Sequence, residues 1–479
     1  MLSRGSKMLD TLPFDILYRI IHFMPILDMV RLQQVSRFFC ELLGARTIWS
    51  ETYRTTLLPH YPGPFPHQSA SFLKQDLVSS AKVAQNWAPN VPVPTEQRTF
   101  QSNEPYDNRR ILMTRWLICL HNSRQINYID MDSANGEVTP SILYSCDSEK
   151  EITDHHYVWT MSPEGHIQAF AVVLEMSCDD DGPHPDDSAL KLFKVSGHDG
   201  PTLSLELVQS YPIISSRQVG FVLCFIGPRL LAINIVASDV DTQSFYIDLK
   251  TFGCYEISIP PIDMIHTRSF ISCSTHLLVI RTPLQYGRDL GYIVLDAFVI
   301  PPAPADGTDI RSELELSYHG THPASVSCIS VLHDPGLNPS RLNPYILLLV
   351  KAVGKSNSKP FIGAMQIDIL QDNSVAVRDI RKICPLPQSP SFLFSSVLGG
   401  SARVLQSRFT RNGIELDAHS FILFLRRDGF DIRHRCTGNV LTGIHEDKDL
   451  LSFNGMRGRL LLSEKKDRNL YSYTVLDFD

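Results

Sequence analysis

The chain has 479 residues, of which 43% are hydrophobic, 20% charged and 9% aromatic, a composition that excludes a largely disordered, collagen-like or coiled-coil protein. Its 44 Lys and Arg residues against 51 Asp and Glu residues give a net charge of -7, which argues against a general binder of nucleic acid or anionic membranes. No apolar run approaches the roughly 18 to 20 residues that span a bilayer. We therefore expect no nucleic acid and no membrane among its partners.

The cysteines indicate a reducing compartment. There are 10 of them, spaced singly and without a Cys-x-x-Cys pair. A disulfide framework or a zinc site would cluster them. We expect reduced cysteines, no metal and no cofactor, in a cytoplasmic or nuclear protein.

Residues 1–9 are predicted to be a flexible N-terminus, and residues 10–58 to form three short helices. The first begins at Pro13, whose missing N–H costs nothing in a first helical turn. Apolar residues then recur at helical spacing until Pro25, and Ser36 is a typical N-cap further on. Three such helices cannot bury all their apolar surface among themselves, so part of it should face a partner or the next domain.

The segment contains Leu12-Pro13-x-Asp15-Ile16-Leu17, then Val35-Ser36-Arg37-x-Phe39 and finally Trp49. In this register, from its Leu-Pro start to its tryptophan, it resembles the F-box motif. The departures are mild, since Asp15 replaces a commoner Glu, and Met24 and Met29 replace Leu. The resemblance implies binding to a Skp-type adaptor, which would link the chain to a cullin–RING ubiquitin ligase. The implied adaptor-binding residues, some of which could pack inward instead, are Leu12, Pro13, Ile16, Leu17, Ile20, Ile21, Met24, Leu32, Val35 and Trp49.

Residues 59–108 are predicted to be a linker with one helix. Proline-rich clusters lie toward both ends, and Ser69–Trp87 between them carries apolar residues at helical spacing. The Asn86-Trp87 ending is similar to the linker of many F-box proteins. We expect Trp87 to anchor the linker on a domain, because an unpacked linker would let the two halves tumble independently.

Residues 109–479 are predicted to be all-β. Short stretches rich in Val, Ile, Tyr and Phe alternate with Gly, Pro, Asn and Asp. Roughly 26 candidate strands at four per blade predict a β-propeller of about seven blades. Only one turn, at residues 162–165, looks like those of WD-repeat blades, so the repeat signal is weak. The protein is thus predicted to be multidomain, a small all-α F-box followed by an all-β domain, with a pair of β-sandwiches as the alternative β fold.

No motif of a common enzyme class is found: the chain lacks a Gly-x-Ser-x-Gly elbow, a His-Glu-x-x-His pair and a phosphate-binding loop. His155 and His156 are adjacent, but neighbours in a strand point to opposite faces. The resemblance therefore implies a non-catalytic receptor subunit of a ubiquitin ligase, which presents a protein substrate through its β domain. Two alternatives are an F-box-tethered propeller enzyme and an adaptor-binding protein that recruits no substrate for ubiquitination.

Basic residues gather near the end of the chain. In a propeller they would fall on loops or strand ends of the last two blades, which are neighbours in the ring. There they would form one positive patch suited to an acidic or phosphorylated substrate segment. These candidate substrate-binding residues are Arg426, Arg427, Arg433, Arg435, Lys465 and Lys466.

Overall fold

The computed structural model describes residues 12–478 apart from internal gaps, and between residues 391 and 457 it describes mainly the backbone. The gaps are 57, 59, 62, 88–92, 103–106, 114, 134–139, 162–165, 180–181, 198–201, 214–220, 228, 237–241, 261–265, 286–287, 290–291, 301–313, 323–324, 335–344, 354–359, 379, 387–390, 398–400, 411–412, 427–428, 445–447, 455–457 and 467–470. The predicted flexible N-terminus, residues 1–9, lies outside the described residues.

Five helices precede the first strand. They are α1 (Phe14–His22), α2 (Ile26–Gln33), α3 (Arg37–Leu42), α4 (Arg46–Thr55) and α5 (Ala70–Asn86). The prediction of three helices over residues 10–58 is wrong by one, because α4 is a fourth. Its N-cap is Ala45, which offers no side-chain hydrogen bond, so the usual sequence signal of a helix start is missing.

The helices share one hydrophobic core, to which α5 contributes. Met29 of α2 and Trp49 of α4 are buried together with Leu73 and Leu77 of α5. The chain between α4 and α5 is also held in place, since the Arg46 guanidinium donates hydrogen bonds to the backbone carbonyls of two linker residues. These are Phe65, at 2.6 Å, and Gln68, at 2.8 Å. The predicted linker helix is therefore part of the helical domain.

Seven antiparallel sheets make up the rest of the described chain. The first sheet contains β2 (Asp107–Leu112), β3 (Trp116–His121), β4 (Gln125–Asp130) and β5 (Ser141–Ser145). The second contains β6 (Lys150–Met161), β7 (Ile167–Asp179), β8 (Gly182–Ser196) and β9 (Ser204–Ile213). The third contains β10 (Phe221–Ile226), β11 (Leu230–Val236), β12 (Thr242–Asp248) and β13 (Cys254–Glu256).

Four further groups of strands complete the set. The fourth sheet contains β14 (His266–Ser272), β15 (His276–Gln285), β16 (Arg288–Asp289), β17 (Ile293–Val299) and β18 (Glu315–His322). The fifth contains β19 (Ser325–His333), β20 (Tyr345–Val353), β21 (Phe361–Ile369), β22 (Val375–Val377) and β23 (Arg381–Pro385). The sixth contains β24 (Ser391–Val397), β25 (Ser401–Thr410), β26 (Gly413–Arg426) and β27 (Gly429–Ile444). The seventh contains β28 (Lys448–Asn454), β29 (Arg459–Lys465), β30 (Tyr471–Asp477) and β1 (Glu96–Ser102).

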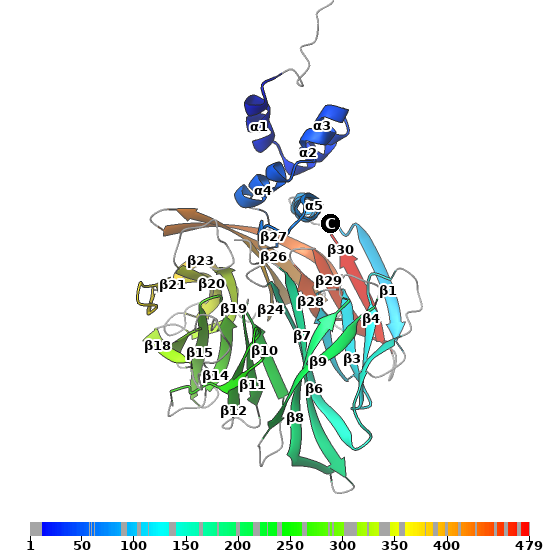
Figure 1. The fold of residues 1–479 in the computed structure, drawn as a ribbon, viewed down its shortest axis with the longest axis vertical. Helices are drawn as coiled ribbons and strands as arrows, with labels where there is room; N and C mark the ends of the chain where they lie inside the picture. Colours follow the sequence, from blue (N-terminus) through cyan, green and yellow to red (C-terminus); the bar gives the residue numbers. More distant parts are fainter. Residues whose placement is uncertain are drawn as a thin grey trace, which may run out of the picture.

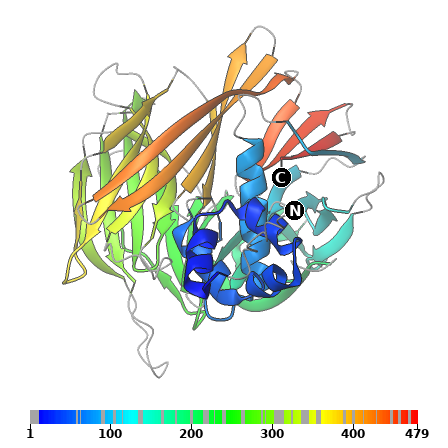
Figure 2. The ribbon, with the colours of Figure 1, turned by 90° about the horizontal axis from the view of Figure 1, so that it is seen from above.

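The sheets follow one another in chain order around the domain (Figure 2). The first strand of each sheet, from β2 to β24, contacts the first strand of the next. Side chains of neighbouring sheets share cores, as β20 illustrates: Ile346 and Leu348 pack with the fourth sheet, whereas Leu347 and Leu349 pack with the sixth. Alternate residues of a strand point to opposite faces, so a strand buried on both sides must be apolar throughout. Two β-sandwiches do not fit this arrangement.

Strand β1 joins the two ends of the β domain. It pairs with β30 from Glu96 opposite Asp477 to Ser102 opposite Tyr471, and Phe100 stacks on Tyr473 with ring centroids 5.1 Å apart. The boundary predicted at residue 109 is therefore too late. The sequence of β1 is polar except for its one phenylalanine, so no local hydrophobic pattern reveals a strand that depends on a partner at the far end of the chain.

The helices sit at one end of the β domain (Figure 1). Trp87 follows α5 and is buried against Phe478, with ring centroids 5.6 Å apart. The Asn86 amide donates to the Phe478 carbonyl at 3.1 Å, and Tyr61 meets Trp159 of β6 edge-on at 6.0 Å. The prediction that Trp87 anchors the linker on a domain is confirmed. The two parts of the chain are thus joined by packed contacts.

Candidate functional site

A surface of exposed apolar side chains covers α1 to α3. Of the 12 large apolar residues that are exposed in the described chain, seven lie between residues 12 and 38. These seven, called the apolar surface below, are Leu12, Phe14, Ile16, Ile20, Phe23, Val35 and Phe38. Large apolar groups scattered singly need no explanation, but such a concentration in one short segment is typical of protein-binding surfaces.

Helix α1 is apolar on two neighbouring sides, so it contributes side chains both to the helical core and to the apolar surface. Leu17 and Ile21, four residues apart, are buried in the helical core. Ile16 and Ile20, also four residues apart, lie on the neighbouring side and are each 41% exposed. Phe23, just after the helix, is 84% exposed.

The structure divides the ten residues that the F-box resemblance implied for adaptor binding. Leu12, Pro13, Ile16, Ile20 and Val35 are exposed, Met24 and Leu32 are partly buried, and Leu17, Ile21 and Trp49 are buried. The last three are the residues that pack inward, because they fill the helical core. The motif comparison also missed Phe14, Phe23 and Phe38, which belong to the apolar surface but are not among the anchor positions of the motif.

Trp49 and its neighbour Tyr53 hold the helices beneath the apolar surface. The Trp49 indole N–H donates to the Leu43 carbonyl at 2.6 Å. The Tyr53 hydroxyl shares its one hydrogen between the Asp76 carboxylate and the Tyr61 carbonyl, which lies 2.8 Å away. Burial, with the nearby Asp76 carboxylate as the next cause, raises the pKa of Tyr53 well above its usual value. Tyr53 is therefore a neutral hydrogen-bond donor that ties α4 to α5.

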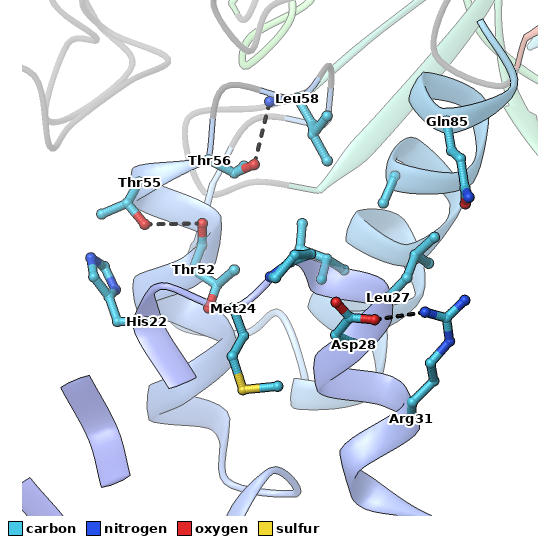
Figure 3. A pocket seen from close by; sticks show the side chains of 13 residues that line it. His22, Met24, Leu27, Asp28, Arg31, Thr52, Thr55, Thr56, Leu58 and Gln85 are labelled. Carbon is cyan, nitrogen blue, oxygen red and sulfur yellow. Dashed lines mark hydrogen bonds and ion pairs between the residues drawn. The ribbon is translucent and has the colours of Figure 1, made fainter. Parts of the chain in front are cut away.

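A cavity of about 520 Å³ lies between the turn joining α1 and α2, helix α4 and helix α5 (Figure 3). Several of its polar side chains already bond within their own helices. Asp28 pairs with Arg31 at 2.6 Å, and the Thr52 and Thr55 hydroxyls each donate to a carbonyl of α4 at 2.9 Å. These groups stabilise helix turns and are not directed to a ligand.

The basic residues of the β domain are not brought together as predicted. Arg433 and Arg435 lie within β27, not on a loop, and Arg427 lies outside the described residues. Lys465 pairs with Tyr471 at the start of β30, whereas α5 packs at the other end of that strand. Arg426 ends β26, which reaches the level of the helices (Figure 1). The prediction of one joint patch fails because it assigned residues to blades without knowing which end of each strand they occupy.

Asp154 of β6 is held by groups from two neighbouring sheets. Both oxygens of the buried Asp154 carboxylate are engaged, by the Arg110 guanidinium at 3.3 Å and by the Val222 N–H at 2.7 Å. Burial, with the Arg110 charge as a second cause, lowers the pKa of His156 to about 4. Within the described part of the chain no group of three metal-binding side chains comes together. No described helix is long and apolar enough to cross a membrane.

Comparison with known proteins gives one specific match. Residues 9–51 match the F-box domain. No curated protein matches the chain.

Among solved structures, the WD40 domain of SCAP from fission yeast has a TM-score of 0.36 at 9% identity, covering 78% of this chain and 84% of that chain. An α-L-arabinanase from Penicillium chrysogenum has a TM-score of 0.30 at 11% identity, covering 67% and 93%. A fucose-specific lectin from Aleuria aurantia has a TM-score of 0.29 at 8% identity, covering 70% and 94%. Likeness at this level carries no argument about activity. The F-box match coincides with the helices that carry the apolar surface, and the chain therefore contains an F-box domain, which a β-rich region follows.

Proposed function

We propose that this F-box protein is a substrate-receptor subunit of a Skp–cullin–F-box type ubiquitin ligase in the cytoplasm or nucleus. The single observation that carries this proposal is the apolar surface on the domain that matches the F-box. Adaptor binding would remove its side chains from water. At interfaces, a few such anchors supply most of the binding free energy, on the order of 2 kcal/mol each.

We further propose that the β domain is a seven-bladed β-propeller that presents the substrate. Seven sheets, consecutive contacts between their first strands and the pairing of β1 with β30 support this fold. The loops at the ends of such a ring are free to vary, which suits them to recognising a protein. The chain itself would perform no chemistry. Its contribution would be proximity, because it holds a substrate near the ubiquitin-loaded enzyme of the ligase.

The packed junction between the two domains supports this role. Trp87 and Asn86 fix the end of α5 on Phe478, and Tyr61 contacts Trp159. A semi-rigid connection keeps the bound substrate at a defined distance from the adaptor, whereas a flexible one would spread it over a large volume.

The adaptor-binding proposal is tested with charges placed on the apolar surface. Ile16→Glu combined with Ile20→Glu puts two carboxylates on exposed positions of α1, so the helical core is left intact. Calorimetric titration of the purified chain with a Skp-type adaptor should show binding for the wild type and at least about a hundredfold weaker binding for the double variant. Arg54→Glu, on the exposed side of α4, is the matched control and should bind normally. Equal affinity of the double variant and the control would refute the proposal.

An enzyme with its active site among the inner strands has less support. One buried carboxylate there, Asp154, is held by Arg110 and by the Val222 N–H. A carboxylate that acts as a general base must instead be free to accept a proton from a substrate. We therefore propose a non-catalytic receptor.

A further inference from the structure

Four charged side chains alternate in sign where the seventh sheet packs against the first. Arg98 of β1 binds Asp477 of β30 and lies 3.5 Å from Asp132, which follows β4. Arg459 of β29 binds the same two carboxylates, with nitrogen–oxygen distances of 2.5 Å to Asp477 and 2.7 Å to Asp132. The side chains of Arg98, Asp477 and Arg459 are 16%, 6% and 10% exposed, so three members of this four-charge cluster are largely withdrawn from water.

The four-charge cluster joins three separate parts of the chain. Arg98 lies on the strand that the linker contributes, Asp132 follows a strand of the first sheet, and the other two members belong to the seventh sheet. Arg98 also donates a hydrogen bond to the Met131 carbonyl at 2.8 Å, which adds a second contact beside the first sheet. A buried charge is destabilising unless it is paired. If β1 left its place, Asp477 would keep only Arg459 of these two cations, so the cluster is complete only with β1 in place.

The backbone next to Asp477 holds the end of helix α5 and the segment that follows it. Phe478 packs against Trp87, and the Asn86 amide donates to the Phe478 carbonyl at 3.1 Å. The Asp477 carbonyl accepts hydrogen bonds from both the backbone N–H and the hydroxyl of Thr95, at 2.8 Å and 3.0 Å. A member of the charge cluster therefore lies directly beside the contacts that hold the helical domain.

The backbone next to Arg459 also meets α5. Gly458 has a φ of +60°, a left-handed conformation that glycine adopts readily, and its carbonyl accepts a hydrogen bond from the Phe478 N–H at 3.1 Å. A Cβ at Gly458 would lie 2.9 Å from a methyl carbon of Val83, so α5 packs directly against this backbone. Displacing Arg459 or Asp477 would therefore move the surface on which α5 rests.

We propose that the four-charge cluster is a lock that joins the seventh sheet to the first and seats the helical domain in one cooperative step. Strand β1 and the end of α5 then open and close together, as a single unit of local unfolding. The position of the helices that carry the apolar surface depends in this way on whether the two sheets are joined. The inference concerns the coupling of the two domains, and it does not depend on what either domain binds.

Hydrogen exchange of the full-length chain, resolved by residue, tests the lock. Asp132→Asn removes one charge of the cluster next to the first sheet and leaves the side chains of β1 and α5 unchanged. The amides of β1 and those of Val83 and Trp87 should nevertheless exchange at least about tenfold faster, and by the same factor, because one opening exposes both places. Arg98→Met removes the charge but keeps a long side chain, and it should have the same effect at both places.

Arg229→Met is the matched control. The Arg229 side chain is also 16% exposed and also binds a carboxylate, that of Asp248 at 2.9 Å, but it lies beside β11 of the third sheet. This variant should leave the exchange of β1 and of the end of α5 unchanged.

Two results would overturn the proposal. One is faster exchange in β1 with normal exchange at the end of α5, in either cluster variant, and the other is unchanged exchange at both places. Equal acceleration by Arg229→Met would overturn it as well, because any lost ion pair would then have the same effect. Should Arg98→Met fail to fold, Asp132→Asn still decides the question, because it leaves the pair of Arg98 and Asp477 in place.

Discussion

Trp49 and Phe23 are both large aromatic residues of the F-box, yet they lie in opposite environments. Trp49 is 1% exposed and bonds the Leu43 carbonyl, whereas Phe23 is 84% exposed. Trp49→Ala should lower the free energy of unfolding of the helical domain by about 3–5 kcal/mol, and Phe23→Ala by less than about 0.5 kcal/mol. Urea unfolding followed through the helical signal measures both. For adaptor affinity, Phe23→Ala should weaken binding although the fold is unchanged. Similar stability of the two variants would contradict this assignment of core and surface.

His156 should make the stability of the β domain depend on pH. Its pKa is lowered to about 4 in the folded chain, whereas an unfolded histidine titrates near 6.5, so between these values the unfolded state binds more protons. Stability should therefore fall as the pH is lowered, by about 1–2 kcal/mol between pH 7 and pH 5. His156→Gln should remove that part of the dependence in unfolding experiments at the two pH values. An unchanged slope in the variant would rule out His156 as its source.

At the residue level, the sequence predicted which segment has apolar residues turned to the surface, but not which of its residues these are. The Leu-Pro start, Ile16 and Ile20 were predicted to face a partner and are exposed. Leu17 and Ile21 could not be separated from them, because an apolar helix with two neighbouring apolar sides offers no local sign of which side packs on α4. Trp49 could not be separated either, because its burial depends on residues outside its own helix. Trp49 in particular packs with Leu73 and Leu77, which are distant in sequence.

At the level of elements, β1 is the strand on which the β domain should depend most. It adds Phe100, which is 5% exposed, and it brings Arg98 into an ion pair with Asp477. Losing Phe100 alone commonly costs about 3–5 kcal/mol. A fragment of residues 93–479 should therefore unfold cooperatively, and a fragment of residues 103–479 should be markedly less stable. Adding a peptide of residues 93–102 should restore stability, measured by thermal unfolding. Equal stability of both fragments without the peptide would show that β1 is dispensable.

The positions of the apolar strands were predicted better than the way in which the strands pair. Apolar strands such as Tyr345–Val353 are evident from the sequence, because both of their faces are buried between sheets. Strand β1 and the first part of β27 were missed because their residues are largely polar, and pairing with β30 and β26 sets their structure. The expectation that the basic residues form one patch failed because the sequence does not show which end of the β domain each strand end occupies. The pairing of the strands within each sheet decides this.

For the whole molecule, we propose that the two domains bind two different partners and that the junction between the domains holds these partners at a fixed separation. Helix α5 packs with the F-box through Leu73 and Leu77, and Trp87 at its end packs with the β domain.

Trp87→Ala should leave adaptor affinity unchanged but loosen the junction between the two domains. Small-angle X-ray scattering should then show a larger spread of distances between the domains. An unchanged scattering profile would mean that Trp87 does not hold the junction.

One chain that couples a ligase to a substrate should bring both into one complex, which quantitative mass spectrometry of purified complexes can detect. The wild type and the Ile16→Glu, Ile20→Glu variant are captured from cells with and without proteasome inhibition. The wild type should recover a Skp-type adaptor, a cullin and a set of proteins that become ubiquitinated and accumulate on inhibition. The variant should recover the same set without adaptor, cullin or ubiquitin. Recovery of adaptor and cullin with no protein that gains ubiquitin, or equal ubiquitination with both chains, would show that the chain is not a substrate receptor.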